Sequence, residues 1–264
     1  MKQFMLITFL SFYQGYSFGC GSSPNQESEG AGNQLPVTEM PSLANCLQSI
    51  KEGSISGDIY SALFTRFNIG TENAEAACEA LAEEAAELRG LSLRNRSLTS
   101  ISGAELLTSI VRLKLDDNLL SEVSGLAELG TLENLDLGNN QITSIPEISS
   151  LPNLEILRVS RNELDSLRDI GRAPKLTNLA VAYNRINSLD GIERYPILRV
   201  LNVSDNAIET IEALLDLENL VSVNIAFNQV CSDEQVAILD LLEQKGVVVI
   251  GKSAQNCQPL AEPR

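Results

Sequence analysis

Apolar positions recur every 22 residues from Leu88 to Val230, without an insertion or a deletion. Within each unit the first, fourth and sixth positions are apolar, and a second apolar set follows at positions eleven, fourteen, seventeen and twenty. The seven units begin at Leu88, Ile110, Leu132, Leu154, Leu176, Leu198 and Leu220. A fixed period of this length is the signature of a solenoid, because one unit buries its apolar side chains only when neighbouring units stack on it.

The first part of each unit predicts a short strand, since apolar and polar positions alternate there with a period of two. The ninth position follows where the chain must turn inward, and it is Asn in six of the seven units. A buried Asn can pair with backbone groups of its own turn and of the neighbouring unit, where an orphaned group would cost about 1–3 kcal/mol. We therefore predict a structural ladder of Asn118, Asn140, Asn162, Asn184, Asn206 and Asn228. Arg96 takes this place in the first unit, and we expect its side chain to reach outward, towards the segment before the repeats.

The string LxxLxLxxNxI with a 22-residue period resembles the leucine-rich repeat of the short class. That class includes the bacterial internalins and the leucine-rich regulatory subunit of protein phosphatase-1. The resemblance covers Leu88–Val230 and implies an α/β repeat solenoid, a horseshoe with a concave parallel β-sheet and short 3₁₀ segments on the convex side. It specifies the fold far better than the function, because the family binds many unrelated partners.

The segments that flank the repeats predict two caps, which a solenoid needs at its open ends. Residues 42–87 predict a helical N-terminal cap. One helix is indicated by Ile59, Leu63, Phe64 and Phe67, and a second by Thr71–Leu88. Residues 231–264 predict an α/β C-terminal cap and tail, in which a helix ends at Gly246 and Val247–Ile250 forms a final strand.

Four cysteines support this layout once Cys20 is set aside. Cys46 and Cys78 precede the repeats, whereas Cys231 and Cys257 follow them. Because the repeats separate the two groups, only the pairs Cys46–Cys78 and Cys231–Cys257 are sterically reasonable. The alternative is four buried free thiols, and an export signal argues against it.

The N-terminus predicts such a signal. Residues 1–19 contain a basic residue, a short apolar stretch of about ten residues that is too short to span a membrane, and a small Gly19 before Cys20. Gly19 and Cys20 resemble the lipobox of bacterial lipoproteins, with Cys20 as the lipidation site, although Ser17 and Phe18 depart from that motif. The alternative is an ordinary signal peptide. Residues 20–41 then read as a flexible polar linker, so we expect an outer-membrane or cell-surface lipoprotein, or alternatively a periplasmic or secreted protein.

Composition narrows the chemistry. The chain has 19 basic and 35 acidic residues and a net charge of −16, which is the opposite of what nucleic-acid binding requires. It contains no His, the usual general base, and no Gly-rich phosphate loop or metal-ligand spacing. We expect no enzyme activity, no cofactor, no metal, no nucleic acid and no small-molecule substrate, and a membrane contact only through the lipid anchor.

The third, fifth and seventh positions of each unit predict the solvent-facing columns of the concave side, with the eighth position at its rim. Exposed aromatic and Arg side chains in such a place are typical of binding hot spots. The candidate partner-binding residues are Arg112, Lys114, Asp136, Ile156, Arg158, Arg161, Tyr183 and Phe227. They favour a non-catalytic module that docks a protein partner on the concave face. The alternatives are a structural envelope protein and a regulatory subunit of a phosphatase-like enzyme.

Overall fold

The computed structural model describes residues 41–52, 58–70 and 73–257. All of these residues belong to the second of the two units into which the chain divides. The signal segment 1–19, Cys20 and nearly all of the linker expected at 20–41 lie outside the described residues.

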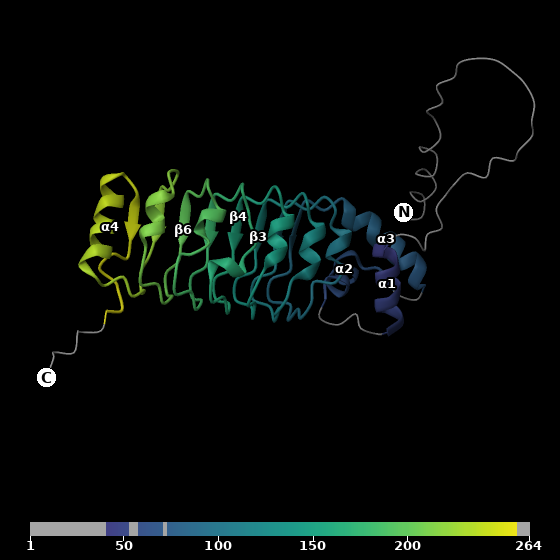
Figure 1. The fold of residues 1–264 in the computed structure, drawn as a ribbon. Helices are drawn as coiled ribbons and strands as arrows, with labels where there is room; N and C mark the ends of the chain where they lie inside the picture. The colour runs from purple at the N-terminus through teal and green to yellow at the C-terminus, as the bar shows by residue number, and fades with distance from the viewer. Residues whose placement is uncertain (1–40, 53–57, 71–72, 258–264) are drawn as a thin grey trace, which may run out of the picture. The chain divides into compact units, whose positions relative to one another are not determined.

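One parallel sheet of eight strands runs through the second unit in the order β1 to β8 (Figure 1). The strands are β1 (Gly90–Ser92), β2 (Arg112–Lys114), β3 (Asn134–Asp136), β4 (Ile156–Arg158), β5 (Asn178–Ala180), β6 (Val200–Asn202), β7 (Ser222–Asn224) and β8 (Val248–Ile250). The 22-residue period appears directly in the register, since Leu91 pairs with Leu113 and Leu113 with Leu135. The eighth strand departs from that period, because Val223 pairs with Val249.

Short 3₁₀ helices carry the chain back from one strand to the next. They are η2 (Ala104–Leu106), η3 (Ser124–Glu128), η4 (Pro146–Ser150), η5 (Leu167–Asp169), η6 (Ile192–Arg194) and η7 (Glu212–Asp216). Each presents one or two apolar residues to the interior, such as Leu167 in η5. The strand side is equally regular, since Leu157 and Val159 are fully buried. These layers join into one hydrophobic core, so the predicted repeat solenoid with a parallel sheet is confirmed.

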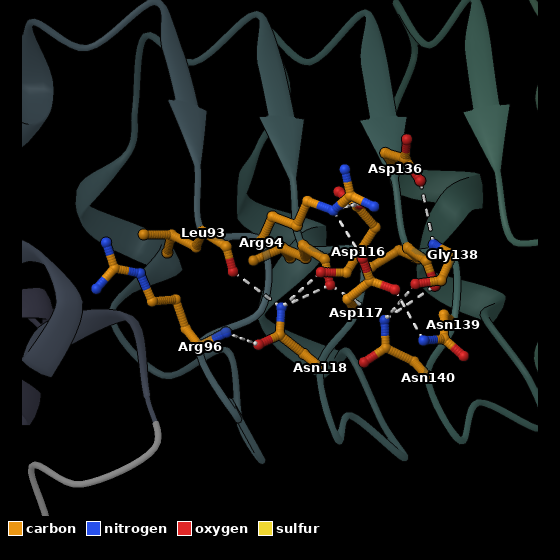
Figure 2. Close-up of polar contacts among 12 residues, drawn as sticks. Leu93, Arg94, Arg96, Asp116, Asp117, Asn118, Asp136, Gly138, Asn139 and Asn140 are labelled. Atoms are coloured by element: carbon orange, nitrogen blue, oxygen red, sulfur yellow. Dashed lines mark hydrogen bonds and ion pairs between the residues drawn. The ribbon is translucent and has the colours of Figure 1, made fainter.

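The Asn side chains of the ninth column connect each turn to the turn before it (Figure 2). The Asn118 side chain accepts from the Leu98 amide at 3.0 Å and donates to the carbonyls of Leu93 and Leu115 at 2.9 and 2.8 Å. Asn140 makes the same three bonds one repeat later, to Leu120, Leu115 and Leu137. Four of the six amides are buried, while Asn184 and Asn206 are half-buried.

Arg96 differs from this column for a reason that the ladder itself supplies. Each ladder Asn serves an amide 20 residues and a carbonyl 25 residues earlier, both in the preceding repeat. No repeat precedes the first one, so its ninth position has no such backbone groups to bond and does not need an Asn side chain. Arg96 is exposed and points away from the ladder, as expected (Figure 2), but it forms no ion pair with any described residue.

Three helices precede β1: α1 (Pro41–Glu52), α2 (Ile59–Phe67) and α3 (Ala74–Ala86). The side chains of Asp58 and Asn73 cap α2 and α3. The first helix, α1, was not expected from the sequence. A disulfide between the buried Cys46 and Cys78 joins it to α3.

Backbone and side-chain contacts dock this cap on the first repeat. The Ile59 amide donates to the Ser102 carbonyl at 3.0 Å, and the Tyr60 hydroxyl donates to the Glu105 carboxylate. Gly103 has a φ of +96°, and a Cβ at this position would lie 2.8 Å from the Tyr60 amide nitrogen. The close approach of α2 to the repeats therefore requires glycine here.

The C-terminal cap consists of α4 (Asp233–Gln244) and β8, joined through Gly246 at a φ of +86°. Ser232 caps α4, and the buried Gln235 accepts from the Ile211 amide at 2.8 Å. A second disulfide joins Cys231 to Cys257, and both cysteines are exposed. Neither α4 nor any other helix in the described part of the chain is long and apolar enough to span a membrane.

Candidate binding face

Two columns of side chains point to solvent from the sheet, and we call this solvent-facing side the concave face. Strand geometry creates it, since neighbouring residues of a strand point to opposite sides. In β4, Leu157 is buried while Arg158 is exposed, and the same alternation holds in every repeat strand. The parallel register then aligns each third position with the next third position, as in the pair Ile156 and Asn178.

A third column, the eighth position of each repeat, follows the carboxyl ends of the strands. Every residue in it adopts a left-handed backbone conformation, with φ between 53° and 60°. Its members are Asn95, Asp117, Asn139, Arg161, Tyr183, Asp205 and Phe227. Asn and Asp tolerate this conformation well, whereas other side chains crowd the following carbonyl at a cost of roughly 1–2 kcal/mol. This conformational cost therefore applies in only three of the seven repeats, at Arg161, Tyr183 and Phe227.

The three exceptions carry large exposed side chains. Tyr183 is 47% exposed and Phe227 is 49% exposed. The Arg161 guanidinium lies 4.3 Å from the centroid of the Tyr183 ring, close enough for a cation–π contact. Arg161 and Tyr183 thus form one pair at the edge of the concave face, and Phe227 lies two repeats further along the same column.

The candidate cations and Ile156 lie on the strands themselves. Arg112 and Lys114 are the exposed residues of β2, and Arg158 is the exposed residue of β4. The Arg158 Nη1 atom donates to the Asn134 Oδ1 atom at 3.1 Å, which orients its guanidinium across β3. Ile156 is half-buried, so it offers less apolar surface than its position in the repeat suggested.

Acidic residues near these cations are mostly engaged within the repeats (Figure 2). The Arg94 Nε atom lies 2.9 Å from an Asp116 oxygen and 2.6 Å from an Asp117 oxygen. The hydrogen bond from Arg94 lowers the pKa of Asp117, and a second bond from Asn139 acts in the same direction. The strong local pairing predicts that Asp117 stays ionised over the whole neutral range.

Asp136 has a structural partner of its own (Figure 2). Its Oδ1 atom accepts from the Gly138 amide at 3.1 Å, and Asn202 and Asn224 accept from the amides two residues ahead in the same way. Burial raises the pKa of Asp136, and the nearby Asp116 adds to that shift, against the Gly138 bond and the cations Arg158 and Lys114. An Asp or Asn at the fifth position thus accepts a hydrogen bond from the backbone amide two residues beyond it, where the strand ends.

No group of three or more Cys, Asp or Glu side chains among the described residues could hold a metal ion. The described face carries cations, amides and exposed apolar groups.

A family model described as leucine-rich repeats (two copies) matches residues 131–171. The chain therefore has the leucine-rich repeat fold. The LRR fold is similar to that of an internalin, InlF, from Listeria monocytogenes, with a TM-score of 0.51 and 23% identity over 68% of this chain. The match spans 58% of that internalin's length. A second internalin, internalin C2 of the same organism, matches with a TM-score of 0.49 and 24% identity over 60% of this chain and 80% of its own. None of the curated protein sequences matches the chain.

The leucine-rich repeat fold is generally a protein–protein interaction module, and its resemblance to an internalin concerns the fold. On the concave face of this leucine-rich repeat protein, three exposed apolar residues were not among the predicted candidates. Val200 is 39%, Val248 57% and Ile250 50% exposed. Val200 occupies the third column, but Val248 and Ile250 join the face only because β8 pairs with β7 outside the 22-residue period.

Proposed function

We propose that this leucine-rich repeat protein is an exported, non-catalytic module that binds a protein partner on its concave face. The observation that carries the proposal is the eighth column. Arg161, Tyr183 and Phe227 hold left-handed backbone conformations that four other repeats fill with Asn or Asp.

The physical argument concerns what these side chains contribute to folding. A half-exposed ring adds only part of the apolar burial of a core residue, and an exposed cation–π contact adds about 0.5–1 kcal/mol. The left-handed conformation removes a similar amount. Folding stability alone therefore favours Asn at these positions, whereas Tyr and Arg are the residues most enriched in binding hot spots. Partner binding explains the choice that folding does not.

Export is the second part of the proposal. The two disulfides fit an oxidising compartment, since cytosolic proteins keep their cysteines reduced. We propose that Cys20 is the lipid attachment site and that the linker after it tethers the repeats to a bacterial membrane. Intact mass of the membrane-extracted protein tests this part, because a lipidated N-terminal Cys20 has a mass that no simple signal-peptide cleavage produces.

The binding proposal is tested with Tyr183→Asn combined with Phe227→Asn, which replaces both rings by the residue that suits the backbone. The matched control is Leu241→Asn on α4, where an apolar side chain of similar exposure, 39%, lies outside the concave face. The wild type and both variants are immobilised and incubated with solubilised cell-envelope proteins. Bound proteins are quantified by mass spectrometry.

We expect at least one protein to be enriched by the wild type and by Leu241→Asn, and to be reduced at least tenfold by the double variant. Circular dichroism should show equally folded proteins. The proposal is overturned if the double variant captures the same proteins in the same amounts, or if the wild type enriches nothing over it.

A further inference from the structure

Over its first four strands, the concave face differs in the sign of its charge from the chain as a whole. Over β1 to β4, the third, fifth, seventh and eighth positions carry five basic and three acidic residues, while the whole chain carries 19 basic and 35 acidic residues. The basic residues are Arg94, Arg112, Lys114, Arg158 and Arg161. A cationic surface on an acidic protein is not the average outcome of its composition.

One of these five cations, Arg94, forms ion pairs with described residues. Arg94 forms ion pairs with Asp116 and Asp117, and Asp136 accepts a hydrogen bond from the Gly138 amide. The other four cations form no ion pair with any described residue, although Arg158 is held by Asn134 and Arg161 by the Tyr183 ring. Two of the four are thus held in place. Asp136 lies in register between Lys114 and Arg158, but none of the four is closed off by a salt bridge to a described residue. We call them the basic zone: Arg112, Lys114, Arg158 and Arg161.

The other half of the same face carries no charge on its strands, and Asp205 is the one charged residue in its part of the eighth column. The third and fifth positions of β5 to β8 are Asn178, Ala180, Val200, Asn202, Ser222, Asn224, Val248 and Ile250. Val200, Ser222 and Val248 are register neighbours, so the two exposed valines lie in one row. We call Val200, Val248, Ile250 and Phe227 the apolar zone. Along the face it follows Tyr183, whose ring contacts Arg161 of the basic zone.

We propose that the partner docks with one polypeptide segment in which acidic side chains are followed by apolar ones, the acids over β2 to β4 and the apolar groups over β5 to β8. This inference rests on the proposed function. Neighbouring strands lie about 4.8 Å apart, so β2 to β8 spans roughly 29 Å, which about nine extended residues can cover. Opposite charges on such surfaces select the partner and set the register of docking.

Selection from a phage library of random 12-residue peptides against the folded protein tests this partner chemistry. The enriched sequences should contain Asp or Glu at least threefold more often than the library, together with Phe, Tyr, Leu or Ile. The test variant changes the four basic-zone residues to Gln. The control variant makes the same charge change at four exposed residues outside the face that form no ion pair with any described residue: Arg66, Arg172, Lys175 and Lys245.

Exposed ion pairs each change an affinity by a factor of about 1.4–5, so we expect the basic-zone variant to bind the selected peptides at least tenfold more weakly, and the control variant to bind them normally. Affinity should also fall as salt is raised. Tyr183→Asn combined with Phe227→Asn should weaken the same peptides.

The outcomes separate the two proposals. If the selected peptides lack acidic residues but still lose binding in the Tyr183 and Phe227 double variant, the face binds protein and the acidic–apolar assignment is wrong. If no peptide is enriched, or none depends on either zone, both proposals fail. If dextran sulfate or anionic phospholipid vesicles bind through the basic zone as tightly as the best peptide, the partner is a non-protein polyanion and the inference is overturned.

Discussion

Removing one amide from the ladder should cost this protein a large share of its stability. Asn162 is 8% exposed and lies near the middle of the repeats. Its side chain accepts from the Ile142 amide at 2.9 Å and donates to the carbonyls of Leu137 and Val159 at 2.9 and 3.1 Å. Asn162→Ala removes these three bonds, together with a longer one to the Ser160 carbonyl at 3.4 Å, and leaves their backbone partners inside the protein.

The expected magnitude follows from those bonds. Each hydrogen bond contributes about 1 kcal/mol net, and an orphaned buried donor adds a desolvation cost of about 1–3 kcal/mol. We therefore expect Asn162→Ala to lower the free energy of unfolding by roughly 4–6 kcal/mol, against a total of about 5–15 kcal/mol for a typical domain. With an m-value near the upper end of the usual range, about 3 kcal/mol per molar urea, the midpoint should fall by about 1.3–2 M.

The control is Arg158→Ala, which removes an exposed side chain four residues earlier and one bond to Asn134. Its effect on the free energy of unfolding, measured by urea denaturation with far-ultraviolet circular dichroism, should stay within about 0.5 kcal/mol. Asn162→Asp should be at least as damaging as the Ala variant, because a carboxylate cannot donate to the Leu137 and Val159 carbonyls. Equal midpoints for Asn162→Ala and Arg158→Ala would refute the structural role of the ladder.

Two further predictions concern charge and redox state. Burial raises the pKa of Asp136, so the folded protein holds this proton more tightly than the unfolded chain, and ionisation lowers stability as the pH rises through the folded-state pKa. Asp136→Asn keeps an acceptor for the Gly138 amide, just as Asn202 and Asn224 accept from the equivalent amides in their own repeats. The variant should be more stable than the wild type at pH 7 but not at pH 3. A gain in urea midpoint of equal size at both pH values would contradict this cause. Dithiothreitol added to the folded protein should reduce the exposed Cys231–Cys257 bond before the fully buried Cys46–Cys78 bond, each worth roughly 3.5 kcal/mol in the chain-entropy model. Mass spectrometry after alkylation gives the order, and reduction of both bonds at one rate would show that burial does not protect the first.

The repeat fold could be predicted from the sequence because every unit has the same pattern of apolar positions. Leu157, Leu179 and their equivalents recur at 22 residues, and a parallel register needs only that equal units stack in step. The cysteine pairs followed from the same layout, since the repeats keep the two ends apart. The helix α1 was missed because Pro41–Glu52 belongs to no repeat and follows a long polar stretch.

The candidate site was only partly visible in the sequence. The Asn and Asp residues in four of seven eighth positions were a local signal for a left-handed backbone, but Arg161, Tyr183 and Phe227 obscured it. Val248 and Ile250 belong to the face through a strand pairing that breaks the period.

The periodic sequence by itself determined the solenoid, its core and the direction of its strands, because those depend on patterns that repeat along the chain. Only the tertiary structure decided which charges are neutralised and which are not. Arg94 reaches Asp116 and Asp117, more than 20 residues later, through the stacking of neighbouring repeats, while Arg112 and Lys114 meet no acid within ion-pairing distance among the described residues. Such pairing depends on distances between side chains of different repeats, and these distances exist only once the repeats have stacked.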